Sequence, residues 1–150
     1  MSMRITFLAA VFAILALIAV GCEEQNEHVE ISQEEKDEIV AVIEKNIEAT
    51  EEENIEAFSE TMYQDHPEFD IAVEETKQLF EQFDLEYELE IQNVSLVDEE
   101  IATVEFEQET RAINGRDFDD NVATGVHEVR KENGQWKIYE TEITESRPIE

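Results

Sequence analysis

The sequence predicts an α+β fold in which three helices precede four antiparallel strands. Two observations lead to this prediction. The spacing of apolar residues changes from a helical period to a period of two at Leu85, and Asn-Gly dipeptides separate the later segments. The chain has 150 residues, which is enough for one domain once a leader is removed. Helices that come first and strands that follow are the order expected of an α+β domain.

The first half of the domain carries the signals of three helices. Ser32 begins a capping box, in which a glutamate follows three residues later, and apolar residues then recur at helical spacing. A second capping box at Thr50 predicts a shorter helix, which ends before Pro67 because the residue before a proline disfavours helical backbone. Asp70 is the expected N-cap of the third helix.

The second half alternates apolar and polar residues, as half-buried strands do. In residues 85–91 the apolar side chains occupy one face and three glutamates the other. Val94 and Leu96 fall on the opposite parity, which predicts a β-bulge near Gln92 that bends the strand. Asn-Gly turns are expected at 114–115 and 133–134. The later strands are expected at 102–111, 121–130 and 136–143.

The chain is strongly acidic, with 40 Asp and Glu residues, 10 Lys and Arg residues and a formal net charge of −30 at pH 7. Binding to nucleic-acid phosphates needs clustered basic residues, so we expect no nucleic-acid partner. Repulsion between the carboxylates is screened by salt, so we expect the fold to be more stable at high salt. The acidic composition resembles that of proteins from salt-loving microbes, and we predict a halophilic origin.

An apolar leader precedes the domain. The run from Ile5 to Gly21 carries no charge, follows the basic Arg4 and ends at small residues, which is typical of a signal peptide spanning residues 1–21. An uncleaved membrane helix is the alternative, since the run is close to the roughly 20 residues that a membrane span needs.

Cys22 is the predicted site of lipid attachment. The tetrapeptide Ala-Val-Gly-Cys that ends at Cys22 resembles the bacterial lipobox, in which the cysteine sulfur is acylated and the leader is cut just before it. Cys22 is the only cysteine, so it cannot form an internal disulfide. Acyl chains would hold the protein to a membrane of the cell envelope, on its extracytoplasmic side, and residues 22–31 would form an acidic tether. A plain membrane anchor, cleaved secretion and a buried thiol are the alternatives.

The segment from Thr124 to Tyr139, TGVHEVRKENGQWKIY, combines a penultimate strand, a tight turn and an aromatic last strand. With the order of elements, this segment resembles the nuclear transport factor 2-like superfamily, also called SnoaL-like or cystatin-like. The resemblance covers the predicted domain, residues 32–143, and leaves 144–150 as a C-terminal tail. It implies a cone, in which the three helices pack in the concave face of a curved, four-stranded, mainly antiparallel sheet.

The resemblance also implies where a general base would lie, because enzymes of this superfamily often place an Asp or His in the cone beside a Tyr or a second acid. The candidates in this chain are Tyr63, Asp65, His66, Tyr87 and His127. For each of them a structural role is the competing interpretation. Asp65-His66-Pro67 also serves as a helix stop, and a histidine on a strand face is commonly a hydrogen-bonded core residue.

Aromatic residues could line an apolar ligand pocket in the cone. Tyr87, Phe106 and Trp136 are the candidates, with the hydrophobic core as the alternative role. Arg111 and Arg116 could hold an anionic ligand or neutralise neighbouring carboxylates. The sequence contains no cluster with metal-ligand spacing and no glycine-rich phosphate loop, so we expect no metal and no cofactor.

The sequence favours a membrane-anchored envelope lipoprotein whose cone binds a small apolar ligand or a partner protein without catalysis. Two alternatives remain. The cone could be a small enzyme of isomerase, dehydratase or hydrolase type, with His127 or Asp65 as general base. The open face of the sheet could instead make the domain a homodimeric structural module.

Overall fold

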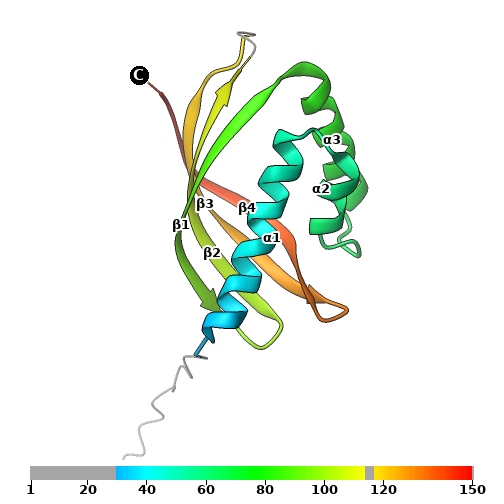
Figure 1. The fold of residues 1–150 in the computed structure, drawn as a ribbon, viewed down its shortest axis with the longest axis vertical. Coiled ribbons are helices and arrows are strands. Elements are labelled where there is room, and N and C mark those ends of the chain that lie inside the picture. The colour runs from blue at the N-terminus through cyan, green and yellow to red at the C-terminus, as the bar shows by residue number, and fades with distance from the viewer. Residues whose placement is uncertain (1–29, 114–116, 150) are drawn as a thin grey trace, which may run out of the picture.

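A computed structural model describes residues 30–113 and 117–149. Three helices lead into one four-stranded antiparallel sheet of order β1-β2-β3-β4 (Figure 1). The helices are α1 (Gln33–Glu51), α2 (Ile55–Thr61) and α3 (Phe69–Gln82). The strands are β1 (Leu85–Leu96), β2 (Ile101–Ala112), β3 (Asn121–Glu132) and β4 (Gln135–Pro148). The predicted α+β class is confirmed. Within the described ranges, no helix has both the length and the apolarity to cross a membrane.

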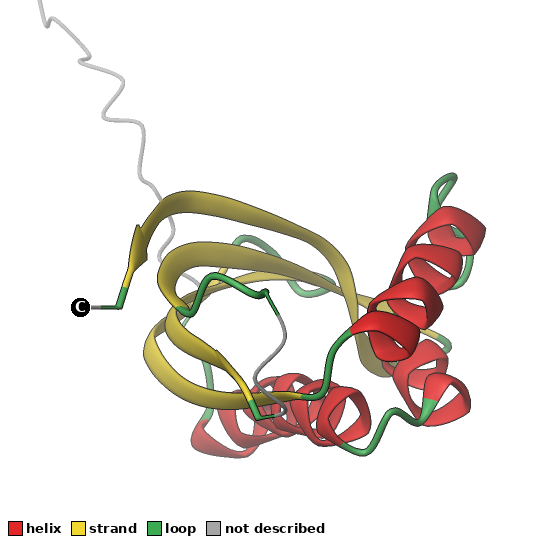
Figure 2. Ribbon diagram, turned by 90° about the horizontal axis from the view of Figure 1, so that it is seen from above, coloured by secondary structure: helices red, strands yellow, loops and turns green. Residues whose placement is uncertain are grey.

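The sheet curls into an incomplete barrel with the helices along its open side (Figure 2). Its curvature comes with three register shifts. One lies in β1 between Ile91 and Asn93, and two lie in the β3–β4 pair, at 124/125 and 128/129. A β-bulge inserts an extra residue on one strand and increases the local twist and bend. The bulge predicted near Gln92 is therefore confirmed.

The core lies between α1 and the concave face of the sheet. Ile39 and Ile43 of α1 are 0% and 1% exposed, and they pack against apolar side chains from all four strands. These strand residues are Val94, Ala102, Val104, Val129, Trp136 and Ile138. Ile31 also packs against this core, so the domain begins within the segment that we predicted to be tether.

The helix starts differ in part from the prediction. Ser32 is the N-cap of α1, as expected, and its hydroxyl accepts a backbone N–H of the first turn. Thr50 caps nothing: it lies in the last turn of α1, where its hydroxyl donates to the carbonyl of Asn46 at 2.8 Å. Glu53 has a positive φ of 54°, which ends α1, so the N-cap of α2 is Asn54. The prediction for Thr50 was wrong because Asn54 is an equally good capping residue in a better place.

The third helix and the last strand also depart from the expected bounds. The N-cap of α3 is Glu68, and Asp70 lies within the first turn of the helix. None of the residues of α3 is fully buried. β4 continues to Pro148, which pairs with Asn121, so residues 144–148 belong to the sheet and do not form a tail. The leader, Cys22, Arg116 and the Asn-Gly turn at 114–115 lie outside the described residues.

Candidate functional site in the cone

His127 is the buried titratable side chain of the concave face. It is 7% exposed and lies on β3, where its Nδ1 atom is 2.8 Å from the hydroxyl of Thr141 on β4. Its ring stacks on Phe106 of β2, with the ring centres 4.2 Å apart and the planes 15° apart. The three residues come from three neighbouring strands, so the sheet itself positions the imidazole.

A bulge in β4 selects the partner of His127. The register pairs Val129 with Ile138 and His127 with Thr141, so Tyr139 is the extra residue between these pairs. A regular ladder would instead place Glu140 opposite His127. A carboxylate in that position would favour the charged imidazolium, whereas the hydroxyl of Thr141 leaves the ring neutral.

Gly125 makes room for the Phe106 ring. The two residues pair across β2 and β3, and a Cβ added to Gly125 would lie 2.9 Å from the Phe106 ring and 2.5 Å from the carbonyl oxygen of Glu142. Contacts this short are not found in folded proteins, so this position requires a glycine. The missing side chain therefore lets the phenyl ring lie flat across β3 and stack on His127.

Burial lowers the pKa of His127 to about 4, so the side chain is neutral at pH 7. Its Nε2 atom is buried and has no hydrogen-bond partner among the described residues. Buried polar atoms are nearly always paired, so an unpaired Nε2 is a place where a ligand or water could bind. As a general base, however, a side chain with a pKa near 4 is poorly matched to neutral pH.

Phe106 and Trp136 fill the interior, as side chains of the core. They are 1% and 5% exposed. The Trp136 ring lies under the ammonium group of Lys131, which is 4.6 Å from the ring centre, and its Nε1 atom has no partner among the described residues. Phe106 is therefore a core side chain, whereas Trp136 belongs to the core and also lines a pocket of about 370 Å³ beside Lys45 and Thr61.

Tyr87 lies at the rim of the sheet, in an acidic setting. It lines a pocket of about 270 Å³ with Arg111 and four glutamates. Its backbone N–H donates to Glu51 of α1 at 2.9 Å, and burial together with the charge of Glu51 raises the pKa of its hydroxyl to about 12. Arg111 forms an ion pair with Glu109, which is the neutralising role that we considered beside the binding of an anionic ligand. Tyr87 therefore holds its proton at neutral pH.

Tyr63, Asp65 and His66 follow α2 and run along the edge of β4. The N–H of Tyr63 donates to the carbonyl of Ile138 at 2.8 Å, and the rings of Tyr63 and His66 lie edge-on to Tyr139, with ring centres 5.4 and 4.5 Å away. Asp65 is exposed to solvent. These residues fasten the segment after α2 to the sheet, and the structure does not pair them with His127.

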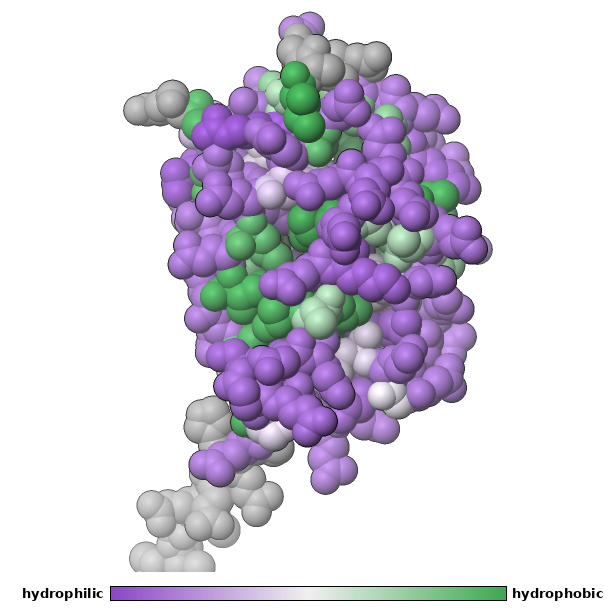
Figure 3. All heavy atoms as spheres, in the orientation of Figure 1, coloured by the Kyte–Doolittle hydropathy of each residue, from purple (hydrophilic) through white to green (hydrophobic). Residues whose placement is uncertain are grey.

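The face of the domain that carries α1 is largely hydrophilic (Figure 3). Figure 3 shows hydrophilic side chains over most of the face that carries α1, with hydrophobic side chains visible mainly near its middle. Within residues 30–113 and 117–149, no group of three or more His, Cys, Asp or Glu side chains is arranged to hold a metal ion.

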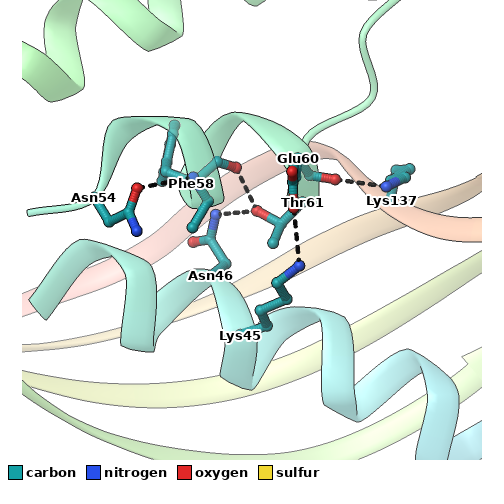
Figure 4. A network of polar contacts seen from close by, with 8 residues as sticks. Lys45, Asn46, Asn54, Phe58, Glu60, Thr61 and Lys137 are labelled. Atoms are coloured by element: carbon teal, nitrogen blue, oxygen red, sulfur yellow. Dashed lines mark hydrogen bonds and ion pairs between the residues drawn. The ribbon is translucent and has the colours of Figure 1, made fainter. Parts of the chain in front are cut away.

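A polar network joins α1, α2 and β4, and no local sequence pattern predicts it (Figure 4). Thr61 is 1% exposed, and its hydroxyl accepts the Asn46 side-chain amide at 2.7 Å. The carboxylate of Glu60 forms an ion pair with Lys45 at 3.2 Å, and its backbone carbonyl accepts a hydrogen bond from the ammonium group of Lys137 at 2.5 Å. The network holds α2 against the start of β4.

The sequence profile of the anti-sigma-I factor RsgI9 C-terminal domain matches residues 41–149. This chain belongs to that family. The RsgI9 C-terminal domain match runs from the middle of α1 to the end of β4, so it includes the whole sheet and the cone. Among curated proteins, none matches the sequence significantly.

Solved structures share the fold of this RsgI9-family domain. A nuclear transport factor 2-like protein of unknown function from Shewanella oneidensis has a TM-score of 0.63 at 15% identity, over 72% of this chain and 97% of its own. A protein with a cystatin-like fold from Nostoc punctiforme has a TM-score of 0.63 at 17% identity, over 76% of this chain and 92% of its own. A ketosteroid isomerase-like protein from Erwinia carotovora atroseptica has a TM-score of 0.63 at 19% identity, over 76% of this chain and 99% of its own. The predicted cone-shaped α+β fold is confirmed, and the likeness extends to the fold alone.

Proposed function

We propose that this protein is a membrane-anchored envelope lipoprotein whose RsgI9-family domain is a non-catalytic binding module. The anchoring part rests on the sequence. An uncharged leader ends at Gly21, Cys22 follows it, and a polar acidic segment leads to the domain. Several acyl chains, at about 0.8 kcal/mol per buried CH₂ group, would hold the domain firmly at the membrane surface.

The binding part is carried by the state of His127. A lowered pKa and a hydroxyl partner suit a neutral hydrogen-bonding group, whereas a histidine that acts as a general base is most effective with a pKa near the working pH. Asp65, the other candidate base, is exposed. The buried Phe106 and Trp136 leave their part of the cone filled with protein side chains. These features favour recognition over proton transfer.

The family also supports a role in recognition. The related domain is, by its name, the C-terminal part of an anti-sigma-I factor, which is a regulatory protein. A domain that serves a regulator needs to recognise something and does not need to turn over a substrate. By extension, we assign this chain to recognition at the cell surface.

Two measurements test the proposal. The intact mass of protein extracted from membranes should begin at Cys22 and include acyl chains, and a Cys22→Ser variant should carry no acyl mass. Retention of Met1 with an unmodified thiol would refute the anchor. For the binding module, NMR of isotope-labelled histidine should find His127 neutral from pH 5 to 8, whereas a pKa near 7 would support the enzyme.

A further inference from the structure

β4 forms one edge of the sheet, and most of that edge is uncovered. The strand pairs with β3 on one side only. On its other side, in the part of the chain that the structure describes, backbone meets β4 at one place, where Met62 bridges to Ile138 and the N–H of Tyr63 donates to the Ile138 carbonyl. Every residue from 140 to 148 is exposed. An exposed strand edge presents backbone donors and acceptors to which another extended chain can pair.

The register shows what this edge presents on each face. Thr141 and Ile143 pair with His127 and Gly125, so they lie on the concave side, and Ile143 is 51% exposed. The carboxylates lie on the convex side. They belong to Glu140, Glu142 and Glu145, which pair with Glu128, Val126 and Thr124. An apolar side chain therefore flanks the edge on one face and a row of negative charge on the other.

We propose that the edge of β4 from Glu140 to Glu145 binds an extended, basic segment of a partner protein as a fifth strand. This inference rests on the proposed binding function and names the class of partner. Backbone hydrogen bonds would supply the affinity of such an added strand, and its side chains would supply the specificity. Because side chains alternate between faces, the segment would alternate apolar residues, beside Ile143, with Lys or Arg, beside the glutamates.

Electrostatics distinguishes the three segments that could pair with this edge: a second copy of β4, the acidic segment before the domain, and a basic partner. A second copy would bring Glu140, Glu142 and Glu145 against the same residues of a chain that carries a net charge of −30. The acidic segment at 23–30, EEQNEHVE, would meet the same repulsion. Like charges directly opposite across a strand pair are destabilising, whereas opposite charges contribute to stability. A basic partner is therefore the occupant that this edge favours.

The β-bulges limit the length of the added strand. Tyr139 and Thr144 are the extra residues of β4 at the two register shifts, so the regular stretch between them is Glu140–Ile143. Bulges twist the edge of a sheet, so another strand cannot pair along its whole length. This is one way in which proteins prevent aggregation at exposed edges. We therefore expect a short contact with salt-dependent affinity.

The test is an NMR titration of the labelled, full-length protein in detergent micelles with a short synthetic peptide that alternates lysine and valine. Amide shifts and slowed hydrogen exchange are expected in residues 140–145. A peptide that alternates glutamate and valine should not bind. A lysine-valine peptide N-methylated on its backbone should bind at least about tenfold more weakly, because it lacks the strand donors.

Charge reversal provides the matched control. Glu140→Lys with Glu142→Lys should weaken binding about tenfold, since each reversal replaces an attraction with a repulsion. Glu86→Lys with Glu88→Lys makes the same change of net charge on β1, at the opposite edge of the sheet, and should weaken it much less. Equal losses would show unselective attraction and would overturn the proposal.

Other results would also overturn it. The proposal fails if the shifts gather away from β4, if N-methylation has no effect, or if the protein pairs with itself through β4. It fails as well if the lysine-valine peptide does not bind. In each of these cases a lipid on Cys22 and a neutral His127 would still support the broader function, so the two failures are distinguishable.

Discussion

The Nδ1 atom of His127 lies 2.8 Å from the hydroxyl of Thr141, and this contact joins a buried side chain in the middle of β3 to the exposed half of β4. The bulge at Tyr139 creates the pairing, because it shifts Glu140 out of register with the histidine. The environment of the one buried titratable group in the described cone is thus set by the backbone of the neighbouring strand.

Thr141→Val should lower the free energy of unfolding by about 1 kcal/mol, because it removes a hydrogen bond and leaves Nδ1 of His127 unpaired. Urea denaturation would measure the loss. Thr141→Ser keeps the hydroxyl and should lie near the wild type. If serine and valine cost the same, the hydroxyl does not contribute.

His127 should make stability depend on pH. Its pKa falls from an ordinary value of 6.5 to about 4 on folding, so the unfolded chain binds more protons between these values. The stabilisation from the neutral ring is therefore complete above about pH 6.5 and is lost as the pH falls toward 4, by as much as roughly 3 kcal/mol. The loss of stability between these pH values should be smaller in His127→Gln, because glutamine does not titrate. The carboxylates titrate in both proteins, so their contribution is the same in each. Parallel stability curves for the two proteins would contradict the assignment.

Gly125→Ala should destabilise the fold by about 2 kcal/mol or more, because the new Cβ would overlap the Phe106 ring and the Glu142 carbonyl. Phe106→Leu in the same chain should recover only part of that loss, since the backbone overlap remains. Gly134→Ala is the control: this glycine has a φ of +79° but open space around it, so its substitution should cost about 1 kcal/mol. Thermal and urea unfolding would rank the variants.

Asn54→Ala should cost about 1 kcal/mol, because the Asn54 side chain accepts the N–H of Ala57 at 3.1 Å and caps α2. Thr50→Ala, by contrast, removes only a bond to the carbonyl of Asn46 within α1 and should cost less. Helical circular dichroism with urea denaturation would compare them. A larger loss at Thr50 would reverse the assignment of the cap.

Salt should stabilise the domain, because a net charge of −30 repels itself at low ionic strength. The screening length falls from roughly 30 Å at 0.01 M to about 3 Å at 1 M salt, so the free energy of unfolding should rise across this range. Sodium chloride titrations of the urea midpoint would measure the gain. A flat dependence would contradict both the charge argument and the predicted halophilic origin.

The spacing of apolar residues and the turn dipeptides were enough to predict the helices, the strands and the bulge of β1, because each of these features is encoded in neighbouring residues. The cap of α2 was not predictable in this way, since Thr50 and Asn54 both suit a cap and only the backbone of Glu53 separates them. The last strand was placed too short because residues 144–148 are polar on both faces, which an edge strand tolerates.

The candidate site depended on longer-range geometry. His127 could be placed on an inward strand face from its neighbours, but its contact with Thr141 requires the extra residue Tyr139 in β4. The outward position of Asp65 likewise depends on how the chain after α2 meets β4. Tertiary register of this kind leaves no local pattern in one sequence.

The absence of fully buried residues in α3 separates this helix energetically from the rest of the domain. Most of the apolar burial that resists opening belongs to α1 and the sheet. The amides of α3 should therefore exchange with solvent through local opening, at a much lower free energy than the global transition that releases the amides of β2 and β3. The domain would then respond to heat or denaturant in two stages, with a helical segment that loosens before a cooperative unit of α1 and the four strands.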